Sequence, residues 1–326
     1  MATTGYLLVD RRDLSEHDRL ILKVLQLYYE YDLTQADIAR RMGFSRPKVS
    51  KLIAEGRERG LVRIEIAEPF GDFSLLEVAL ENRYGLAEAV VVPSGERRLI
   101  TDLLAGSAGG ALLARVCRPT TVLGISWGRL LRALVDAVSP RTFACNKILP
   151  LVDGMGKAET DLHSNELCAT FAERLGVDHG QLAAPAIAPS ARFRAELIST
   201  PGIGDFLAER AACDAAVVGI GGILPTSTVV GAEYFTLGEF LRLNEHGAVG
   251  DVCCHFLDAE CNPCLPELSE RIVGLTLEQL RAIPKTIGIA TGAEKAPGVA
   301  AVLRGSYVDV LITDQELAEG LLELAP

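Results

Sequence analysis

The chain has 326 residues, of which 49% are hydrophobic and 23% charged, and its formal net charge at pH 7 is −11. This length suits two domains with buried cores. No apolar run reaches the roughly 18–20 residues of a membrane span, and the N-terminus lacks the basic and apolar regions of a signal peptide. Eight cysteines without framework spacing favour reduced thiols. We therefore expect a cytoplasmic protein.

Positive charge is concentrated near the N-terminus. Residues 40–63 contain eight Lys or Arg and two Glu, whereas residues 69–326 contain 20 basic and 32 acidic residues. A basic segment in an acidic protein is typical of a surface that docks on the DNA phosphate backbone. The acidic remainder should be repelled by DNA and needs another role.

The N-terminal part predicts three helices. Residues 16–31 carry apolar side chains at helical spacing. Thr34 is placed to cap a second helix by accepting from the N–H of Asp37, and Gly43 permits the left-handed turn that ends it. Ser45 is the expected N-cap of the third helix. Residues 61–68 then alternate as a strand.

Helix, short turn, helix and strand wing form the architecture that inserts its second helix into the major groove. We assign Arg46 and Ser50 to base edges, and Lys48, Lys51 and Arg57 to phosphates. The predicted contacts to double-stranded DNA are Thr34, Gln35, Ser45, Arg46, Lys48, Ser50, Lys51 and Arg57. The alternative is a small helical domain with a solvated basic face.

A linker separates this region from the rest. Pro69 and Gly71 interrupt the pattern, and Ser74 with Glu77 predicts a capping box for the next helix. We therefore expect a DNA-binding domain at 1–68 and a second domain at 69–326.

The second domain alternates apolar strands with helices. Strands are expected at 90–93, 121–126, 147–154, 214–222, 252–258, 286–291 and 308–314, and helices at 96–117, 127–138, 163–175, 276–282, 294–304 and 314–323. This pattern predicts an α/β fold with a doubly wound, mainly parallel sheet, in which ligands bind at the carboxyl ends of the strands.

Three strand ends carry candidate chemistry. Gly124, Ser126, Trp127 and Gly128 form a turn into a helix that could cradle a phosphate, although such a turn can also serve packing alone. Asp251 could accept hydrogen bonds from sugar hydroxyls or simply cap a strand. Lys295 could bind a phosphate or a hydroxyl, or face solvent.

One glycine pattern is rejected as a nucleotide site. Gly219 and Gly221 have the spacing of a dinucleotide fingerprint, but Leu224 stands where the third glycine is required. No cofactor is therefore expected.

These segments in this order resemble the SorC family of sugar-responsive bacterial transcription regulators over nearly the whole chain. The resemblance lies in LTQADIARRMGFSRPKVSKLIAEGRERGLVRIEI, GISWGRLL, GIGG, GAVGD with FLD, and IATGAEKAPGVAAVLRGSYVDVLITDQELAEGLL. It implies a DNA-binding domain joined to a Rossmann-like effector domain related to phosphosugar isomerases. It also implies homotetramers and ligands that are phosphorylated sugars or sugar alcohols.

The resemblance also implies effector contacts. The residues that match the family pattern are Gly124, Ser126, Trp127, Gly128, Gly221, Gly222, Asp251 and Lys295. Asp153 departs from it, because some relatives have Arg or Lys there, and a carboxylate favours a polyol group over a second phosphate. His163 and Asn165 could reach the same pocket or merely begin a helix.

A second departure is the CxxC pair Cys261 and Cys264, where zinc binding is conceivable but the family pattern gives a turn. We predict no metal.

The leading hypothesis is a transcription factor controlled by a small carbohydrate effector. The alternative is an enzyme resembling a phosphosugar isomerase, but no acid–base pair is marked by the sequence, and we name no catalytic residue. A purely architectural DNA protein is hard to reconcile with so large an acidic domain.

Overall fold

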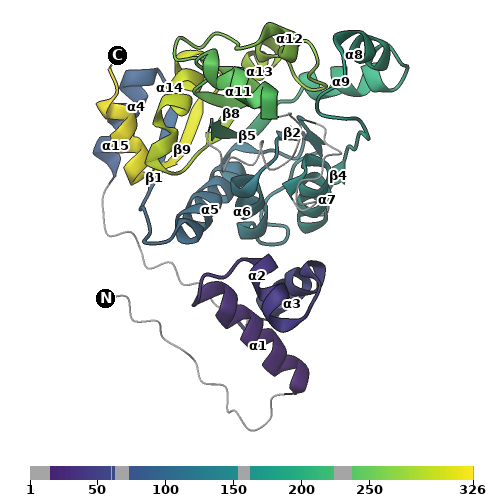
Figure 1. Cartoon of the computed structure of the whole chain (residues 1–326), viewed down its shortest axis with the longest axis vertical. Helices are drawn as coiled ribbons and strands as arrows, with labels where there is room; N and C mark the ends of the chain where they lie inside the picture. The colour runs from purple at the N-terminus through teal and green to yellow at the C-terminus, as the bar shows by residue number, and fades with distance from the viewer. Residues whose placement is uncertain (1–14, 60, 63–72, 153–161, 224–236, 326) are drawn as a thin grey trace. The chain divides into compact units, whose positions relative to one another are not determined.

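The computed structural model describes residues 15–59, 61–62, 73–152, 162–223 and 237–325. It divides into two compact units, Met1–Glu68 and Pro69–Pro326 (Figure 1). The expected strand at 61–68 and the glycine at 60 lie almost wholly outside the described residues, as does Asp153.

The first unit is a three-helix bundle. Its helices are α1 Glu16–Tyr29, α2 Gln35–Met42 and α3 Arg46–Glu58. Ile21, Leu25, Ile38, Val49 and Ile53 form its core, with exposed fractions of 4% or less. The helical spacing of these side chains places them on facing sides of the three helices.

The local signals predicted at the two ends of α2 and at the start of α3 are confirmed. Thr34 Oγ1 accepts from the N–H of Asp37 at 3.1 Å, and Gly43 takes a left-handed conformation with φ 69°. Ser45 is the N-cap of α3, but its side chain makes no capping hydrogen bond.

The second unit is an α/β domain. Its strands are β1 Glu88–Val92, β2 Val122–Ile125, β3 Lys147–Pro150, β4 Asp178–His179, β5 Ala215–Gly222, β6 Gly250–Val252, β7 His255–Leu257, β8 Thr286–Ile289 and β9 Val310–Asp314. Its helices are α4 Ser74–Tyr84, α5 Arg98–Val116, α6 Arg129–Ala137, α7 Ser164–Leu175, α8 Ala191–Ile198, α9 Ile203–Ala211, α11 Leu237–Glu245, α12 Pro266–Ser269, α13 Leu277–Ala282, α14 Ala296–Arg304 and α15 Gln315–Glu323, with the short 3₁₀ helix η2 Ala293–Lys295.

The main sheet has the order β1-β9-β8-β5-β2-β3-β4, and its neighbouring strands are parallel. Alternate residues serve opposite faces. On β5, Ala215 and Val217 join the core beneath α5, α6 and α7, whereas Ala216, Val218 and Ile220 join the core beneath α14 and α15 (Figure 1). Apolar runs that face helices on both sides explain why the strands lack polar alternation.

The predicted strand at 252–258 is wrong, because the segment is a hairpin. Strands β6 and β7 pair antiparallel, with Val252 opposite His255. The two residues between them, Cys253 and Cys254, have φ values of 49° and 66°. Such a turn usually carries Asn or Gly, so a Cys-Cys turn inside an apolar run gave no sequence signal.

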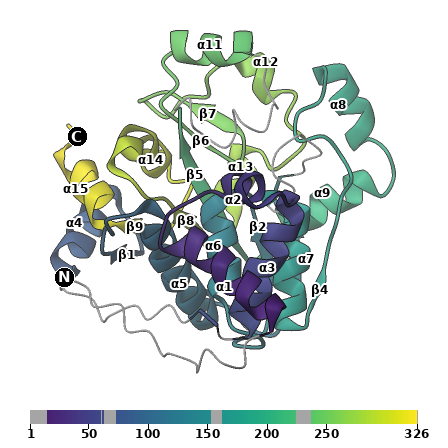
Figure 2. The same ribbon diagram turned by 60° about the horizontal axis from the view of Figure 1, so that its bottom comes forward.

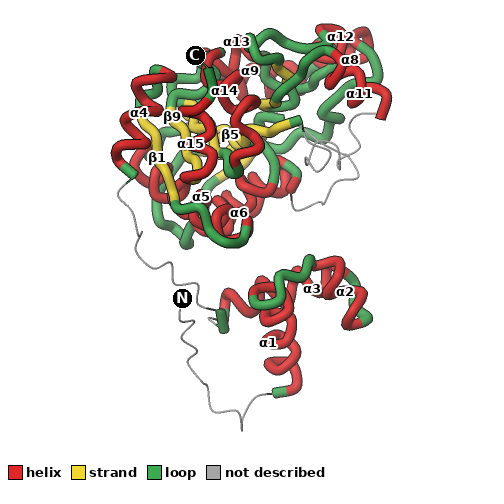
Figure 3. Tube along the Cα trace, turned by 60° about the vertical axis from the view of Figure 1, so that its left-hand side comes forward, coloured by secondary structure: helices red, strands yellow, loops and turns green. Residues whose placement is uncertain are grey.

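The capping box expected at Ser74 is also wrong. Phe73 is the N-cap of α4, Ser74 is its first residue, and no side chain caps this end. The Glu77 carboxylate instead accepts from the N–H of Val91 at 2.9 Å, and that of Glu81 accepts from the N–H of Ala89 at 2.9 Å. Helix α4 therefore lies along β1 and covers backbone donors of this edge strand (Figure 3).

Replacing Glu77 and Glu81 together by Ala should destabilise the second unit. Two backbone donors on a largely buried strand would lose their acceptors, and each loss should cost about 1–3 kcal/mol. Urea denaturation measures the change in the free energy of unfolding. The exposed Asn82 of the same helix is the matched control, since Asn82→Ala shortens a polar side chain that faces solvent. Equal effects of the control and the double variant would contradict this role.

Helix α5 is long and apolar. Among the described helices it alone is long and apolar enough to cross a membrane by length and composition. Ala105, Leu112 and Leu113 on α5 are buried in the core beneath the sheet. A Cβ on Gly106 would lie 2.6 Å from the backbone of Ala133, so α5 packs closely on α6. It is a core helix of the α/β fold.

Candidate functional site

Helix α3 presents basic side chains on its outer face. Lys48 and Lys51 are exposed, and Arg46 and Ser50 lie half-buried on one flank of the same helix. Lys48 Nζ lies 4.0 Å from the centre of the Phe44 ring, which holds this ammonium near the start of the helix. Among these predicted contacts, the two assigned to phosphates, Lys48 and Lys51, are thus more exposed than the two assigned to base edges, Arg46 and Ser50.

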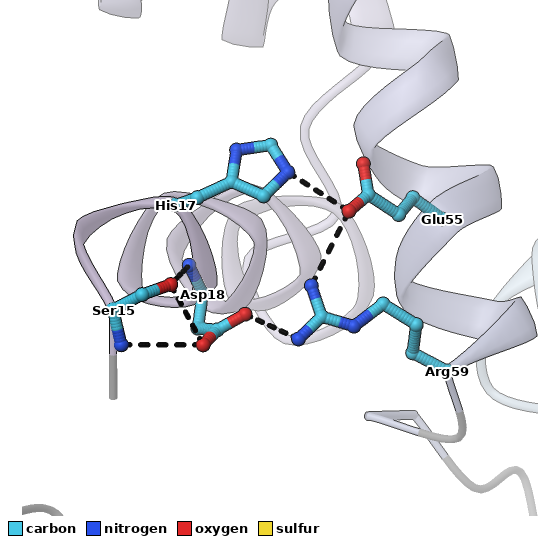
Figure 4. Close-up of polar contacts among 5 residues, drawn as sticks. All are labelled: Ser15, His17, Asp18, Glu55 and Arg59. Carbon is cyan, nitrogen blue, oxygen red and sulfur yellow. Dashed lines mark hydrogen bonds and ion pairs between the residues drawn. The ribbon is translucent and has the colours of Figure 1, made fainter. Parts of the chain in front are cut away.

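Two other cations of the basic segment join helices within the unit. Arg57 Nε of α3 donates to the hydroxyl of Tyr29 on α1 at 2.6 Å. Arg59 forms ion pairs with Asp18 of α1 and with Glu55, which also bonds His17 at 2.8 Å (Figure 4). A phosphate contact by Arg57 stays a prediction, now for a side chain that also holds α3 against α1.

Two carboxyl groups of the network in Figure 4 have lowered pKa values. Hydrogen bonds from Ser15 and then Arg59 hold the pKa of Asp18 below its usual value. The hydrogen bond with His17 is the main cause that lowers the pKa of Glu55. The start of α2 is fixed as well, because Thr34 both caps the helix and donates to the Asp37 carboxylate at 2.6 Å. The neighbouring Gln35 is half-buried.

In the second unit, the strand order reverses between β2 and β5. Chain connections leave β2 toward β3 and β4, then return to β5 and continue to β8 and β9. Such a switch point is where ligands enter parallel sheets. Ser126 lies there with 1% of its surface exposed, and its hydroxyl accepts from the N–H of Gly219 at 3.0 Å. Ser126 therefore ties together the two strand ends.

The glycines of this loop have different roles. Gly128 is the N-cap of α6 with φ 116°, and its N–H donates to the Leu162 carbonyl at 3.2 Å. A Cβ on Gly124 would lie 2.3 Å from a methyl group of Leu151. Gly124 therefore has a packing role in the structure. Packing was the alternative to a phosphate cradle that the sequence left open for this loop.

Asp251 lies opposite Gly221 in the pairing of β5 with β6, and Gly222 lies opposite Gly250. A Cβ on Gly221 would stand 2.0 Å from Asp251 Oδ1, so the carboxylate occupies the space that a side chain would fill. Only 7% of Asp251 is exposed. Burial raises its pKa to about 7, against the opposing effects of the Lys295 charge and the Cys254 N–H.

Lys295 is half-buried at the end of η2. Burial, and next the charge of Arg98, lower its pKa to about 8. Asp251 lies opposite Gly221 at the carboxyl end of β5, and Lys295 follows β8, the parallel neighbour of β5, so the two predicted effector residues lie at the same end of the sheet.

Three carboxylates that the sequence analysis missed hold the loop before Lys295. Asp314 accepts from the N–H of Gly292 at 2.8 Å, and Asp102 accepts from the hydroxyl of Thr291 at 2.8 Å. Glu294 pairs with Arg98 at 2.7 Å. Each of these contacts joins residues that are far apart in the sequence, so no local pattern marks them.

The β6–β7 hairpin extends beyond β5 beside α11 and α12 (Figure 2). The Trp127 side chain hydrogen-bonds the Cys254 thiol, and it packs beside an apolar cluster around Phe256 and Cys264. In the described ranges, no group of three or more His, Cys, Asp or Glu side chains could hold a metal ion. Cys264 is buried in that apolar cluster. This position is compatible with the turn that the family pattern implies for Cys261 and Cys264.

His163 and Asn165 lie at the start of α7. His163 is the buried N-cap residue of the helix, with 7% of its surface exposed. The Asn165 amide donates to the carbonyl of Leu182 at 2.9 Å and accepts from its N–H at 3.4 Å. Asn165 thus lies in the first turn of α7 and anchors a neighbouring loop, and its contact with an effector stays a prediction.

Comparisons with known proteins agree with this geometry. The Sugar-bind family model, a sugar-binding domain, matches residues 68–323, and a MarR family model matches residues 24–69. The sorbitol operon regulator of Klebsiella pneumoniae is 34% identical over 95% of this chain and 99% of its own length. The deoxyribonucleoside regulator of Bacillus subtilis is 28% identical over 94% of this chain and 98% of its own length.

Solved structures agree as well. The crystal structure of the full-length sorbitol operon regulator SorC from Klebsiella pneumoniae has a TM-score of 0.72 at 33% identity, covering 95% of this chain and 100% of that one. These relatives are named as regulators and not as enzymes. The helix-turn-helix unit, the α/β domain and the matches over nearly the whole chain together place this protein in the SorC family of sugar-responsive bacterial transcriptional regulators.

Proposed function

We propose that the chain binds operator DNA through α3 and is controlled by a phosphorylated sugar or sugar alcohol at the carboxyl ends of β2, β5 and β8. The observation that carries this proposal is that a buried carboxylate, Asp251, and a half-buried ammonium, Lys295, lie at the carboxyl ends of two neighbouring parallel strands, β5 and β8. A carboxylate accepts from hydroxyls, and an ammonium binds a phosphate as a point charge.

The neighbouring loop supports the phosphate part of this proposal. Gly128 begins α6, so the free N–H groups of the first turn and the helix dipole favour an anion there. Ser126 accepts from the N–H of Gly219, and a hydroxyl held in this way can still donate its proton to a ligand oxygen. Two relatives are named a sorbitol operon regulator and a deoxyribonucleoside regulator, which suits a small carbohydrate derivative as the effector.

The proposal extends to assembly and location. One α3 helix reads one half-site, and operators for such proteins repeat half-sites about one helical turn apart. We therefore infer a homo-oligomer in the cytoplasm, a tetramer by the family resemblance. Effector binding would change operator affinity by changing how the copies present their α3 helices.

A thermal-shift screen with pairs of sugar alcohols and their phosphates tests the effector class. A ligand at 100 times its dissociation constant should stabilise the protein by about 2.7 kcal/mol. We expect the unfolding temperature to rise with the phosphorylated member of a pair, and this rise to be nearly lost in the Lys295→Ala variant. Lys285→Ala, at the amino end of β8, is the control. Equal shifts with both members of every pair would overturn the phosphate assignment.

A further inference from the structure

Arg98 is a second cation near the proposed effector site, and neither the sequence motifs nor the family pattern marks it. It is the first residue of α5, which follows edge strand β1, yet its guanidinium reaches the end of β8. Nη2 lies 3.4 Å from the Thr291 carbonyl, and Nη1 lies 2.7 Å from Glu294 Oε1. Both partners belong to the loop that leads into Lys295.

Cations and carboxylates both act on Lys295 at this loop. Arg98 acts on Lys295 by repulsion, and so does Arg129 at the start of α6. Asp102 and Glu294 oppose them. Asp102 and Asp314 bind neutral donors of this loop, the Thr291 hydroxyl and the Gly292 N–H, whereas Glu294 bonds the Arg98 guanidinium itself.

The ion pair between Arg98 and Glu294 is exposed enough for another anion to replace the carboxylate. Its side chains are 44% and 42% exposed, and exposed ion pairs contribute little to stability. The Glu294 carboxylate also lies over Gly292, where a Cβ would stand 2.6 Å from its oxygen. A bound phosphate offers a guanidinium two oxygens and a higher charge than this carboxylate does.

We propose that Arg98 is a second phosphate ligand, which Glu294 holds beside the site until the effector phosphate replaces that carboxylate. The inference rests on the proposed function, because it assumes that the phosphate lies at Lys295. It assigns specificity for a phosphate monoester to an arginine on α5 as well as to the lysine on η2. Arg98 then joins α5 to the strand end through the ligand.

Inorganic phosphate is the probe, because it carries the phosphate chemistry without any sugar. Trp127 is the one tryptophan of the chain and lies on the adjoining loop, so its fluorescence reports binding at this edge. Full-length protein is titrated with phosphate, and with chloride at matched ionic strength. Arg98→Gln should weaken phosphate binding about tenfold, the effect of losing one charge-assisted contact.

Two further variants distinguish a ligand from a general charge effect. Glu294→Gln should tighten phosphate binding severalfold, because the competitor for Arg98 is weakened. Arg115→Gln is the matched control, since Arg115 lies on the same helix and pairs with Glu88, at the other end of the strands. It should bind phosphate as the wild type does.

The outcomes separate the two proposals. Wild-type binding that is lost in Lys295→Ala but unchanged in Arg98→Gln overturns the role of Arg98 and leaves the proposed function intact. Weaker binding in Glu294→Gln overturns the exchange. Failure of the wild type to distinguish phosphate from chloride overturns both the inference and the phosphate part of the proposed function.

Discussion

Replacing Lys48 and Lys51 by Gln should remove most operator affinity while leaving the effector response intact. Both side chains are exposed on the outer face of α3, and within the described ranges neither is paired with a carboxylate. Each phosphate contact contributes about 0.9 to the slope of log affinity against log salt, so the double variant should lose about 2 from that slope for each bound copy. Fluorescence anisotropy over a salt series measures it.

The control for this variant is Lys23→Gln. Lys23 is exposed on α1, so its replacement changes the charge of the same unit without touching α3. It should keep the wild-type slope. Lost affinity with an unchanged slope in the double variant would mean that the two lysines do not meet phosphates. Arg57→Ala is a poorer test, because it also removes the hydrogen bond to Tyr29.

Replacing Asp251 by Asn should abolish the effector-induced thermal shift and flatten the pH dependence of stability. The wild-type carboxyl has a pKa of about 7 in the folded chain against an ordinary value of 3.8. Between these values the folded state binds a proton that the unfolded state releases. Wild-type stability relative to the variant should therefore fall by about 1.4 kcal/mol per pH unit between roughly pH 4 and pH 7.

The titration of the neighbouring Lys295 does not disturb the comparison of the wild type with Asp251→Asn. Lys295 has a pKa of about 8 in the folded chain, so it stays protonated in both states through most of that range. Urea denaturation at several pH values gives the two stability curves. Asp214→Asn, at the amino ends of β2 and β5, should retain the wild-type slope because Asp251 is unchanged. Parallel curves for wild type and Asp251→Asn would show that this carboxyl does not titrate near neutrality.

The raised pKa of Asp251 and the need for glycine at position 221 indicate that stability is given up here for function. The Asp251 charge is unfavourable in its buried position, and Gly221 gives up a side chain to make room for it. A site selected for stability alone would bury an apolar residue there. The arrangement is intelligible if the carboxylate binds hydroxyls of an effector.

Local features of the fold were predictable because their causes are local. The cap at Thr34 depends on one side chain and a backbone donor three residues away, and the turn at Gly43 depends on the absence of a Cβ. The apolar strands were predictable because the central strands of the main sheet are covered on both faces. Short peripheral elements such as β4, α8, α9, α11 and α12 were missed, since they bury too little to leave a period in the sequence.

The wrong predictions have one physical reason in common. Glu77 could have closed a capping box but instead meets a strand donor 14 residues away, at Val91. The Cys253–Cys254 turn keeps a left-handed backbone that the surrounding hairpin imposes. In each case a tertiary contact overrides the local preference of the residues concerned.

The basic helix-turn-helix unit, the acidic α/β unit and the strand ends with polar side chains can all be predicted from the order of the residues. Charge and apolar spacing are properties of the chain, so they can be read before it folds. The contacts of Asp251 with the space at Gly221, of Asn165 with Leu182, and of Arg98 with the loop before Lys295 are visible only in the folded protein. Those outcomes depend on which distant residues meet when the sheet assembles, and sequence spacing does not encode such distances.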